Sequence, residues 1–381
     1  MTATTTNKPR KKRNTRTVNL VLAIDFGGSL TKLVGGISQN QYVAMTMEPE
    51  VVEVTEGGIR LHEKNAIGSG RPKDRSWVKL NGKVYAVGYL ARQFLGDAGL
   101  WKAKTEIAIQ KLLAALWVMK RHWSKQLGNK RIRIDLACLL PPGEYQEKTE
   151  FEASVREALE GFESPDGKMM ISCNNFYCFP EGFGVLSNFE YQWGQDFLKN
   201  KVCAVVMLGH RNSSLMVCHR GRVNQFDSSE LGFIQLVRKV IQRTAGLEET
   251  SLSEAMAMAG HDIDPHYLEP VLRHQDPVMR KQELENLIEA ISISRQEYLI
   301  LLEEWILKTI PSTVTEVVLC GGTADYLEEL PALSQFRLYQ PGDIKVPYLF
   351  SQLNIGNRMT DVAGLWDWTI ERSFPVSKKT I

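Results

Sequence analysis

The 381-residue sequence lacks several features that would place a protein in a special class. No apolar run approaches the ~18 residues that a membrane-spanning helix needs, so a membrane protein is not expected. No apolar core follows the basic residues of the N-terminus, so a signal peptide is not expected either. The six cysteines show no paired spacing of the kind that holds zinc. Reduced thiols and a cytoplasmic location are therefore predicted.

The chain also has little net charge, +2 at pH 7, so no strong field over the whole protein is expected. The exception is residues 1–17, which contain six lysines and arginines and no acid. Such a segment cannot build a core and is predicted to be a disordered basic tail. It offers an electrostatic contact to a DNA-bound adaptor or an anionic membrane, and a solvated tail without a partner is the alternative. No sequence-specific nucleic-acid motif is present.

The length favours two domains over one, and 43% hydrophobic with 24% charged residues is ordinary for a globular protein. Local patterns predict several elements. An Asn-Gly turn between two alternating runs predicts a hairpin over residues 77–87. Apolar residues at helical spacing predict helices over residues 103–120 and 284–310. Residues 59–61 are predicted to be strand.

Three apolar strands, each followed by a glycine-containing turn, organise the chain. They occupy residues 18–29, 202–214 and 316–323. In the first, Asp25 stands at the end of the strand, where a carboxylate can hold a hydrated Mg²⁺. The glycines that follow let a backbone approach a ligand, and exposed N–H groups beside hydroxyls can cradle a phosphate. An ordinary hairpin with a returning strand over residues 31–37 is the alternative, and the two interpretations do not exclude each other.

Taken in this order, the three units resemble the actin/Hsp70/sugar-kinase ATPase superfamily, whose two similar halves face each other across a nucleotide cleft. Four further stretches resemble the prokaryotic actin-like proteins of the ParM/StbA plasmid-segregation type. They are the hairpin at Trp77–Ala91, the step at Leu139–Tyr145, the connecting element at Phe179–Gly184 and the helix start at Ser229–Phe233. The resemblance covers about residues 18–370 and implies an α/β, two-domain actin-like ATPase fold.

The resemblance also implies a division of the chain. After the basic tail, a first actin-like domain would occupy residues 18–200, with a small insert around residues 48–100. A second actin-like domain would follow over residues 201–350. Residues 351–381 would contain a helix that returns to the first domain.

The site residues are carried over from the family onto matching positions. The implied cofactor is ATP or GTP with Mg²⁺. Asp25 would hold the metal through water, and Glu181 would orient or deprotonate the attacking water. The residues implied around the phosphates and ribose come from all three turns: Gly27, Gly28, Ser29, Thr31, Lys32, Gly209, Arg211, Asn212, Ser213, Gly232, Gly321, Gly322 and Thr323.

The second turn departs from the family pattern Asp-x-Gly-x-x-Thr-x-Asp. Met207 and Ser214 stand at the two acidic positions. The loss of both carboxylates leaves the phosphate-binding backbone in place but predicts slow hydrolysis.

The expected function is a nucleotide-dependent protein that assembles with itself into cytoplasmic filaments, in plasmid or DNA segregation or as a bacterial cytoskeleton. One alternative is a sugar-type small-molecule kinase, but such an enzyme needs an aspartate as general base, and no convincing candidate follows a glycine-rich loop in the first half. The other is a scaffold that binds nucleotide without hydrolysing it.

Overall fold

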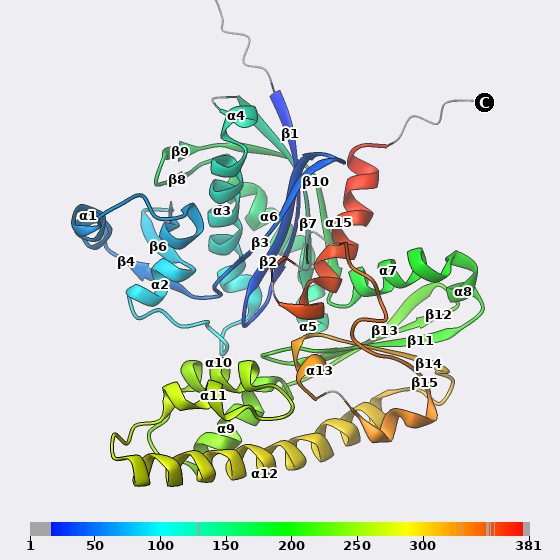
Figure 1. Cartoon of the computed structure of the whole chain (residues 1–381). Coiled ribbons are helices and arrows are strands. Elements are labelled where there is room, and N and C mark those ends of the chain that lie inside the picture. Colours follow the sequence, from blue (N-terminus) through cyan, green and yellow to red (C-terminus); the bar gives the residue numbers. More distant parts are fainter. Residues whose placement is uncertain are drawn as a thin grey trace, which may run out of the picture.

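The structure is a computed structural model that describes residues 17–375, apart from residues 129, 328, 348, 349, 351 and 354. The predicted basic tail therefore lies outside the described residues, except for Thr17, which begins the first strand. Three five-stranded sheets organise the described chain. Two of them form the centres of an upper and a lower half in Figure 1, and the third lies beside the upper one.

The sheet of the upper half has the strand order β10-β7-β1-β2-β3. Its strands are β1 (Thr17–Phe26), β2 (Thr31–Ser38), β3 (Gln41–Met47), β7 (Arg131–Leu140) and β10 (Ile171–Pro180). The central strand β1 pairs antiparallel with β2 and parallel with β7. Its residues from Leu20 to Ile24 are fully buried because helices cover both faces of the sheet. These are α3 (Lys104–His122) and α6 (Lys148–Glu160) on one face and α15 (Thr360–Ser373) on the other.

The smaller sheet has the order β4-β6-β5-β8-β9. The predicted hairpin is confirmed as β5 (Trp77–Leu80) and β6 (Lys83–Val87), and the positive φ angles of Asn81 and Gly82 are those of a type I′ turn. The strand β4 (Val51–Val54), which pairs with β6, also comes from the expected insert. The last two, β8 (Phe162–Ser164) and β9 (Gly167–Met169), come from later in the chain.

The prediction of strand at residues 59–61 is wrong, because these residues lie in helix α1 (Glu56–Asn65). The Thr55 side chain accepts a hydrogen bond from the Gly58 N–H at 3.0 Å and caps the helix. Two more short helices belong to this region, η1 (Pro72–Arg75) and α2 (Tyr89–Gln93).

The sheet of the lower half repeats the topology of the upper one, with the order β13-β12-β11-β14-β15. Its strands are β11 (Val202–Leu208), β12 (Ser213–His219), β13 (Arg222–Ser229), β14 (Glu316–Cys320) and β15 (Arg337–Tyr339). The strand β11 pairs antiparallel with β12 and parallel with β14, as β1 does with β2 and β7. The chain therefore contains two similar α/β halves, and the predicted fold class is confirmed.

Helices cover both faces of this lower sheet as well. One face packs against α9 (Phe233–Arg243), α10 (Glu249–Ala259) and the 33-residue α12 (Pro277–Thr309). The other packs against α7 (Phe183–Trp193) and α8 (Gln195–Lys199). The chain thus leaves the upper sheet at the end of β10 and packs against the lower sheet from α7 onward, which is earlier than the expected domain boundary at residue 200.

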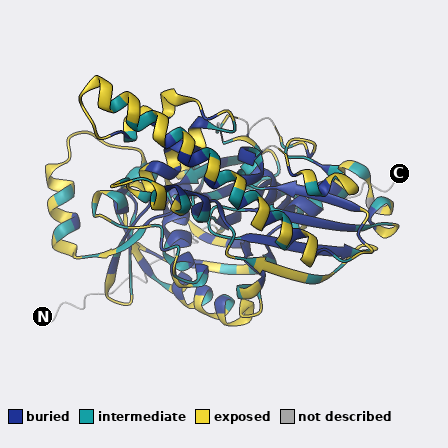
Figure 2. Ribbon diagram, turned by 90° about the horizontal axis from the view of Figure 1, so that it is seen from below, coloured by how far each residue is buried: buried dark blue, intermediate teal, exposed yellow. Residues whose placement is uncertain are grey.

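Short helices make up most of the remaining regular structure. They are α4 (Ser124–Leu127), α5 (Pro142–Tyr145), α11 (Pro265–Leu268), η2 (Glu269–Val271), α13 (Gly322–Leu327), η3 (Pro331–Gln335) and η4 (Gly356–Met359). Strands of the two main sheets are mostly buried, and exposed residues gather on the outer helices (Figure 2). Among the described residues, no helix has the length and apolar character needed to cross a bilayer.

The two halves are joined where α7 crosses α15. A Cβ atom on Gly184 would lie 2.7 Å from the Leu365 backbone nitrogen, so the two helix backbones are in direct contact. The buried carboxylate of Asp361 strengthens the junction by accepting hydrogen bonds from the N–H groups of Gly182 and Gly184, both at 2.8 Å. This junction forms the base of the space between the halves.

Candidate functional site

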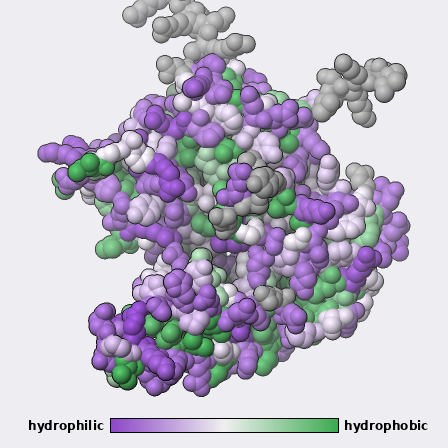
Figure 3. Space-filling view, in the orientation of Figure 1, coloured by the Kyte–Doolittle hydropathy of each residue, from purple (hydrophilic) through white to green (hydrophobic). Residues whose placement is uncertain are grey.

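A cavity of about 500 Å³ lies between the two halves. Figure 3 shows the surface hollowed at this level. The volume of the cavity is in the range of ~300–1,000 Å³ that is usual for small-molecule sites. All three glycine turns line it. All but three of the residues predicted for the site belong to the lining: Asp25, Gly27, Gly28, Ser29, Lys32, Glu181, Gly209, Arg211, Asn212, Gly321, Gly322 and Thr323.

The other three, Thr31, Ser213 and Gly232, lie behind the cavity wall. Thr31 is buried in β2, and its hydroxyl has no hydrogen-bond partner among the described residues. The Ser213 hydroxyl donates to the Leu231 carbonyl at 2.6 Å. Gly232 precedes α9 at a point where a Cβ atom would collide with the Arg211 backbone. Ser213 and Gly232 therefore fix the second turn against the start of α9.

The first two turns approach each other across the cavity. A Cβ atom on Gly28 would lie only 3.3 Å from the Cβ of Arg211. Within the described part of the chain, the backbone N–H groups of Gly27, Gly28 and Ser29 donate no hydrogen bond. Free N–H groups in a tight turn suit an anion such as a phosphate. The first turn is thus both the predicted hairpin and an available anion cradle.

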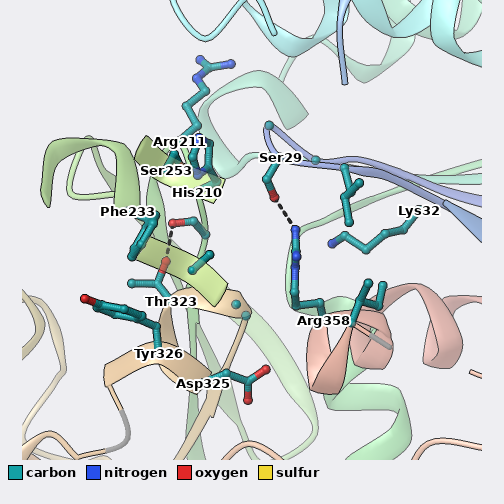
Figure 4. Close-up of a pocket in the computed structure, with 18 of the residues that line it drawn as sticks. Ser29, Lys32, His210, Arg211, Phe233, Ser253, Thr323, Asp325, Tyr326 and Arg358 are labelled. Atoms are coloured by element: carbon teal, nitrogen blue, oxygen red, sulfur yellow. Dashed lines mark hydrogen bonds between the residues drawn. The ribbon is translucent and has the colours of Figure 1, made fainter. Parts of the chain in front are cut away.

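The second and third turns are held together by side chains. The Gly209 N–H donates to the Asn212 carbonyl at 3.1 Å and closes the second turn. The Thr323 hydroxyl donates to the Gly209 carbonyl at 2.8 Å (Figure 4). Gly321 has a φ of +95° and packs so tightly on the Leu208 backbone that no side chain fits there.

Two acids on the cavity floor are paired with lysines. Asp25 forms a salt bridge with Lys32, and Glu181 forms one with Lys104. Burial disfavours the ionised form of Asp25, but Lys32 and Lys104 outweigh that effect and hold its pKa below the ordinary value. Burial likewise opposes the charge of Lys104, while Glu181 and Asp25 raise its pKa above the ordinary value. Asp25 and Lys104 are therefore charged at neutral pH.

Asp25 fits the part of a metal-binding acid. It is ionised, buried and directly below the first turn. The described residues contain no cluster of three or more candidate metal ligands. A single buried carboxylate such as Asp25 suits Mg²⁺, which keeps several waters and takes one or two carboxylates together with phosphates.

Met207 and Ser214, the two neutral replacements, are cross-strand partners in the β11–β12 hairpin. The missing acids would therefore stand next to each other. The Ser214 hydroxyl instead donates to the Glu181 carboxylate at 3.3 Å, and it accepts from the Asn212 side chain at 3.0 Å. The second turn is thus connected to Glu181 by hydrogen bonds.

Residues 23–184 match the family described as "Actin like proteins N terminal domain". A ParM filament structure from Clostridium botulinum matches 94% of this chain and 100% of its own, with a TM-score of 0.62 and 13% identity. This chain has the actin-like fold. The structure of an Alp12 filament covers 93% of the actin-like chain and 99% of its own, at TM-score 0.54 and 18% identity. The structure of an archaeal actin homologue, Ta0583, in complex with ADP matches 92% of this chain and 98% of its own, with a TM-score of 0.53 and 14% identity. Comparison with curated proteins finds no match.

The structure of the actin-like chain also places residues in the cavity that sequence patterns did not indicate. Lys104 begins α3, Arg358 lies in η4, and Asp361 follows at the start of α15. Burial raises the pKa of Asp361 to about 7. Burial also lowers the pKa of His210 to about 4, so this imidazole is neutral at pH 7. Lys104, Arg358 and Asp361 could have been identified only from contacts between residues far apart in the sequence.

The side chain of Arg211 does not point toward the first and third glycine turns of the actin-like chain. Figure 4 shows it directed away from Lys32 and Arg358. Its guanidinium lies 3.5 Å from the Glu144 carboxylate, which also accepts from the Thr105 N–H at 3.0 Å. A direct phosphate contact by Arg211 stays a prediction, since the side chain is engaged with the upper half.

Proposed function

We propose that this chain binds ATP or GTP with Mg²⁺ in the cleft, assembles with itself into filaments and hydrolyses the nucleotide slowly. One observation carries the proposal. The turns at Gly27–Ser29 and Gly209–Asn212, one from each half, face each other across a single cavity with Asp25 and Glu181 on its floor. The filament structures of ParM and Alp12 and the ADP complex of Ta0583 support it by similarity of fold. The cellular role would be plasmid or DNA segregation, or a bacterial cytoskeleton in the cytoplasm.

Each cavity group has a distinct task in this proposal. The free N–H groups of Gly27–Ser29 bind the phosphates, and Asp25 holds the metal through water. Bound Mg²⁺ would neutralise charge on the transferred phosphate. Glu181 positions the attacking water, with its carboxylate held in place by Lys104 and Ser214. Positioning and electrostatic stabilisation are the main requirements of phosphoryl transfer.

A scaffold that binds nucleotide with no turnover is the second candidate. The neutral side chains of Met207 and Ser214 favour it, because acidic groups that would hold water are missing from the second turn. Phosphate release measured during assembly separates the two candidates.

Sedimentation tests the proposal as a whole. The purified chain should pellet at high speed with ATP or GTP and Mg²⁺, and should stay in the supernatant with no nucleotide. A protein that remains in the supernatant at high concentration with every nucleotide would contradict it.

Asp25→Asn should lower the affinity for Mg-nucleotide by about 10- to 100-fold, because a charge-assisted contact is lost while an oxygen remains beside Lys32. The fold should persist, since β1 is held by its neighbouring strands. Calorimetric titration with Mg²⁺ and with a chelator measures the effect, and Asp74→Asn in the surface helix η1 is the control. Unchanged affinity and assembly would favour the ordinary hairpin over the metal site.

Deleting residues 1–16 should leave assembly intact, because a segment this rich in charge and poor in apolar residues cannot contribute to a core. If the tail contacts DNA or an anionic membrane, the deletion should abolish that binding. The affinity of the full chain for DNA or anionic vesicles should also fall steeply as the salt concentration rises from about 50 to about 200 mM. Co-sedimentation with DNA or anionic vesicles checks both points. An affinity that does not change with salt concentration would rule out the electrostatic role.

A further inference from the structure

Arg358 differs from the other cations that line the cavity. Lys32, Lys104, Arg92 and Arg211 each form a salt bridge, with Asp25, Glu181, Glu254 and Glu144 respectively. Among the described residues, Arg358 forms no salt bridge with a carboxylate, and its Nη2 donates only to the Ser29 hydroxyl, at 2.6 Å. The Arg358 guanidinium is therefore paired with a neutral hydroxyl, whereas the other lysines and arginines of the lining are paired with carboxylates.

The surroundings of Arg358 make this unpaired charge costly. Burial lowers the pKa of Arg358, against the attraction of Asp325 and Asp25. A guanidinium nonetheless stays protonated at neutral pH, because its ordinary pKa lies far above 7. A partly buried charge that cannot be neutralised by losing a proton requires an anionic partner. The partner that would fit is an anion that enters the cavity.

Arg358 also lies where the phosphates would be bound. Its side chain packs on the third turn, since a Cβ atom on Gly322 would approach it to within 3.1–3.2 Å. From there it reaches Ser29 in the first turn, so the guanidinium spans the space between these two turns (Figure 4). The fork of N–H donors on an arginine matches a pair of phosphate oxygens.

We propose that Arg358 is a direct ligand of the nucleotide's phosphates. This rests on the proposed function and adds a residue to it. When a nucleoside polyphosphate enters, the guanidinium exchanges the Ser29 hydroxyl for phosphate oxygens and gains the anionic partner that it lacks. Its positive charge acts in a cleft where the second turn carries no acid at positions 207 and 214. The site is therefore selective for a charged phosphate chain and not for the nucleoside alone.

Three variants test this proposal by calorimetric titration. Arg358→Gln removes the charge, Arg358→Lys keeps it without the fork, and Arg60→Gln removes a charge from exposed helix α1 as a control. Each is titrated with ATP and GTP and with adenosine and guanosine. Arg358→Gln should lose about 10- to 100-fold in triphosphate affinity while nucleoside affinity stays within about twofold. Arg358→Lys should recover part of the loss, and Arg60→Gln should behave as the wild type.

Two outcomes would overturn the role of Arg358 alone. One is a triphosphate affinity within about twofold of the wild type in Arg358→Gln. The other is an equal loss for nucleoside and triphosphate, which would indicate a general disturbance of the cleft. A wild-type chain that binds no nucleotide at all would instead overturn the proposed function, and the role of Arg358 with it.

Discussion

Replacing Glu181 by glutamine should reduce phosphate release by about 10²- to 10⁴-fold while nucleotide binding and assembly persist. The Glu181 carboxylate is bonded to both halves, to Lys104 in the upper half and to Ser214 in the lower half. In the proposed site the phosphates bind to backbone N–H groups of the first turn, so nucleotide binding should be affected less than hydrolysis. Filaments of the variant should therefore persist longer than those of the wild type.

The choice of glutamine follows from the buried ion pair. Alanine would leave the Lys104 ammonium buried without a partner, which costs about 3–5 kcal/mol and would confuse a catalytic effect with a loss of stability. Glutamine keeps an oxygen that Lys104 and Ser214 can still contact. Phosphate release and light scattering should be recorded together, with Glu53→Gln in strand β4 of the smaller sheet as the control.

Met207→Asp provides the complementary measurement. It places an acid beside Ser214 at one of the two positions that are acidic in the pattern this turn resembles, and it should raise the rate of phosphate release. If Glu181→Gln hydrolyses at the wild-type rate, another group positions the water. If the wild type already matches relatives that keep both acids, the alignment of the second turn is wrong.

Gly184→Ala should destabilise the protein by at least about 3 kcal/mol. The added Cβ would meet the backbone of α15, which cannot rotate away as a side chain could. The same helices carry the contacts of Asp361 with Gly182 and Gly184, so any separation would also break buried hydrogen bonds. The junction between the halves should therefore open or fail to form.

Chemical denaturation measures this effect, with Gly143→Ala as the matched control. Gly143 lies in α5, and a Cβ atom there would meet no atom within 4 Å. The control should unfold at the wild-type midpoint or slightly above it, because alanine favours helix. Equal midpoints for Gly184→Ala and the wild type would contradict the close crossing of α7 and α15.

Much of the fold was predictable because its signals are local. The Asn81-Gly82 turn specifies its own hairpin, and the apolar periodicity at residues 103–120 predicts α3 to within two residues at each end. The long helix was predicted to begin at residue 284, but it begins at Pro277, where the Asp276 side chain caps two N–H groups. The error at residues 59–61 has the same origin, because the cap at Thr55 outweighs a short apolar run.

The cavity was only partly predictable for a physical reason. The three turns carry their own glycines and hydroxyls, so sequence patterns and the family resemblance indicate them. Lys104, Arg358 and Asp361 enter the cavity through contacts with residues far away in the chain, such as Arg358 with Ser29 and Asp361 with Gly184. A local pattern contains no information on such pairs, and a lysine on an amphipathic helix ordinarily faces solvent.

Nucleotide bound between the two glycine turns is proposed to drive assembly, and electron cryomicroscopy of the purified chain with ATP, with GTP and with no nucleotide tests this directly. Filaments are expected only with nucleotide, with density for the phosphates between Gly27–Ser29 and Gly209–Asn212, next to Asp25 and Arg358. Absence of filaments under all three conditions, or filaments whose nucleotide lies outside this cavity, would contradict it.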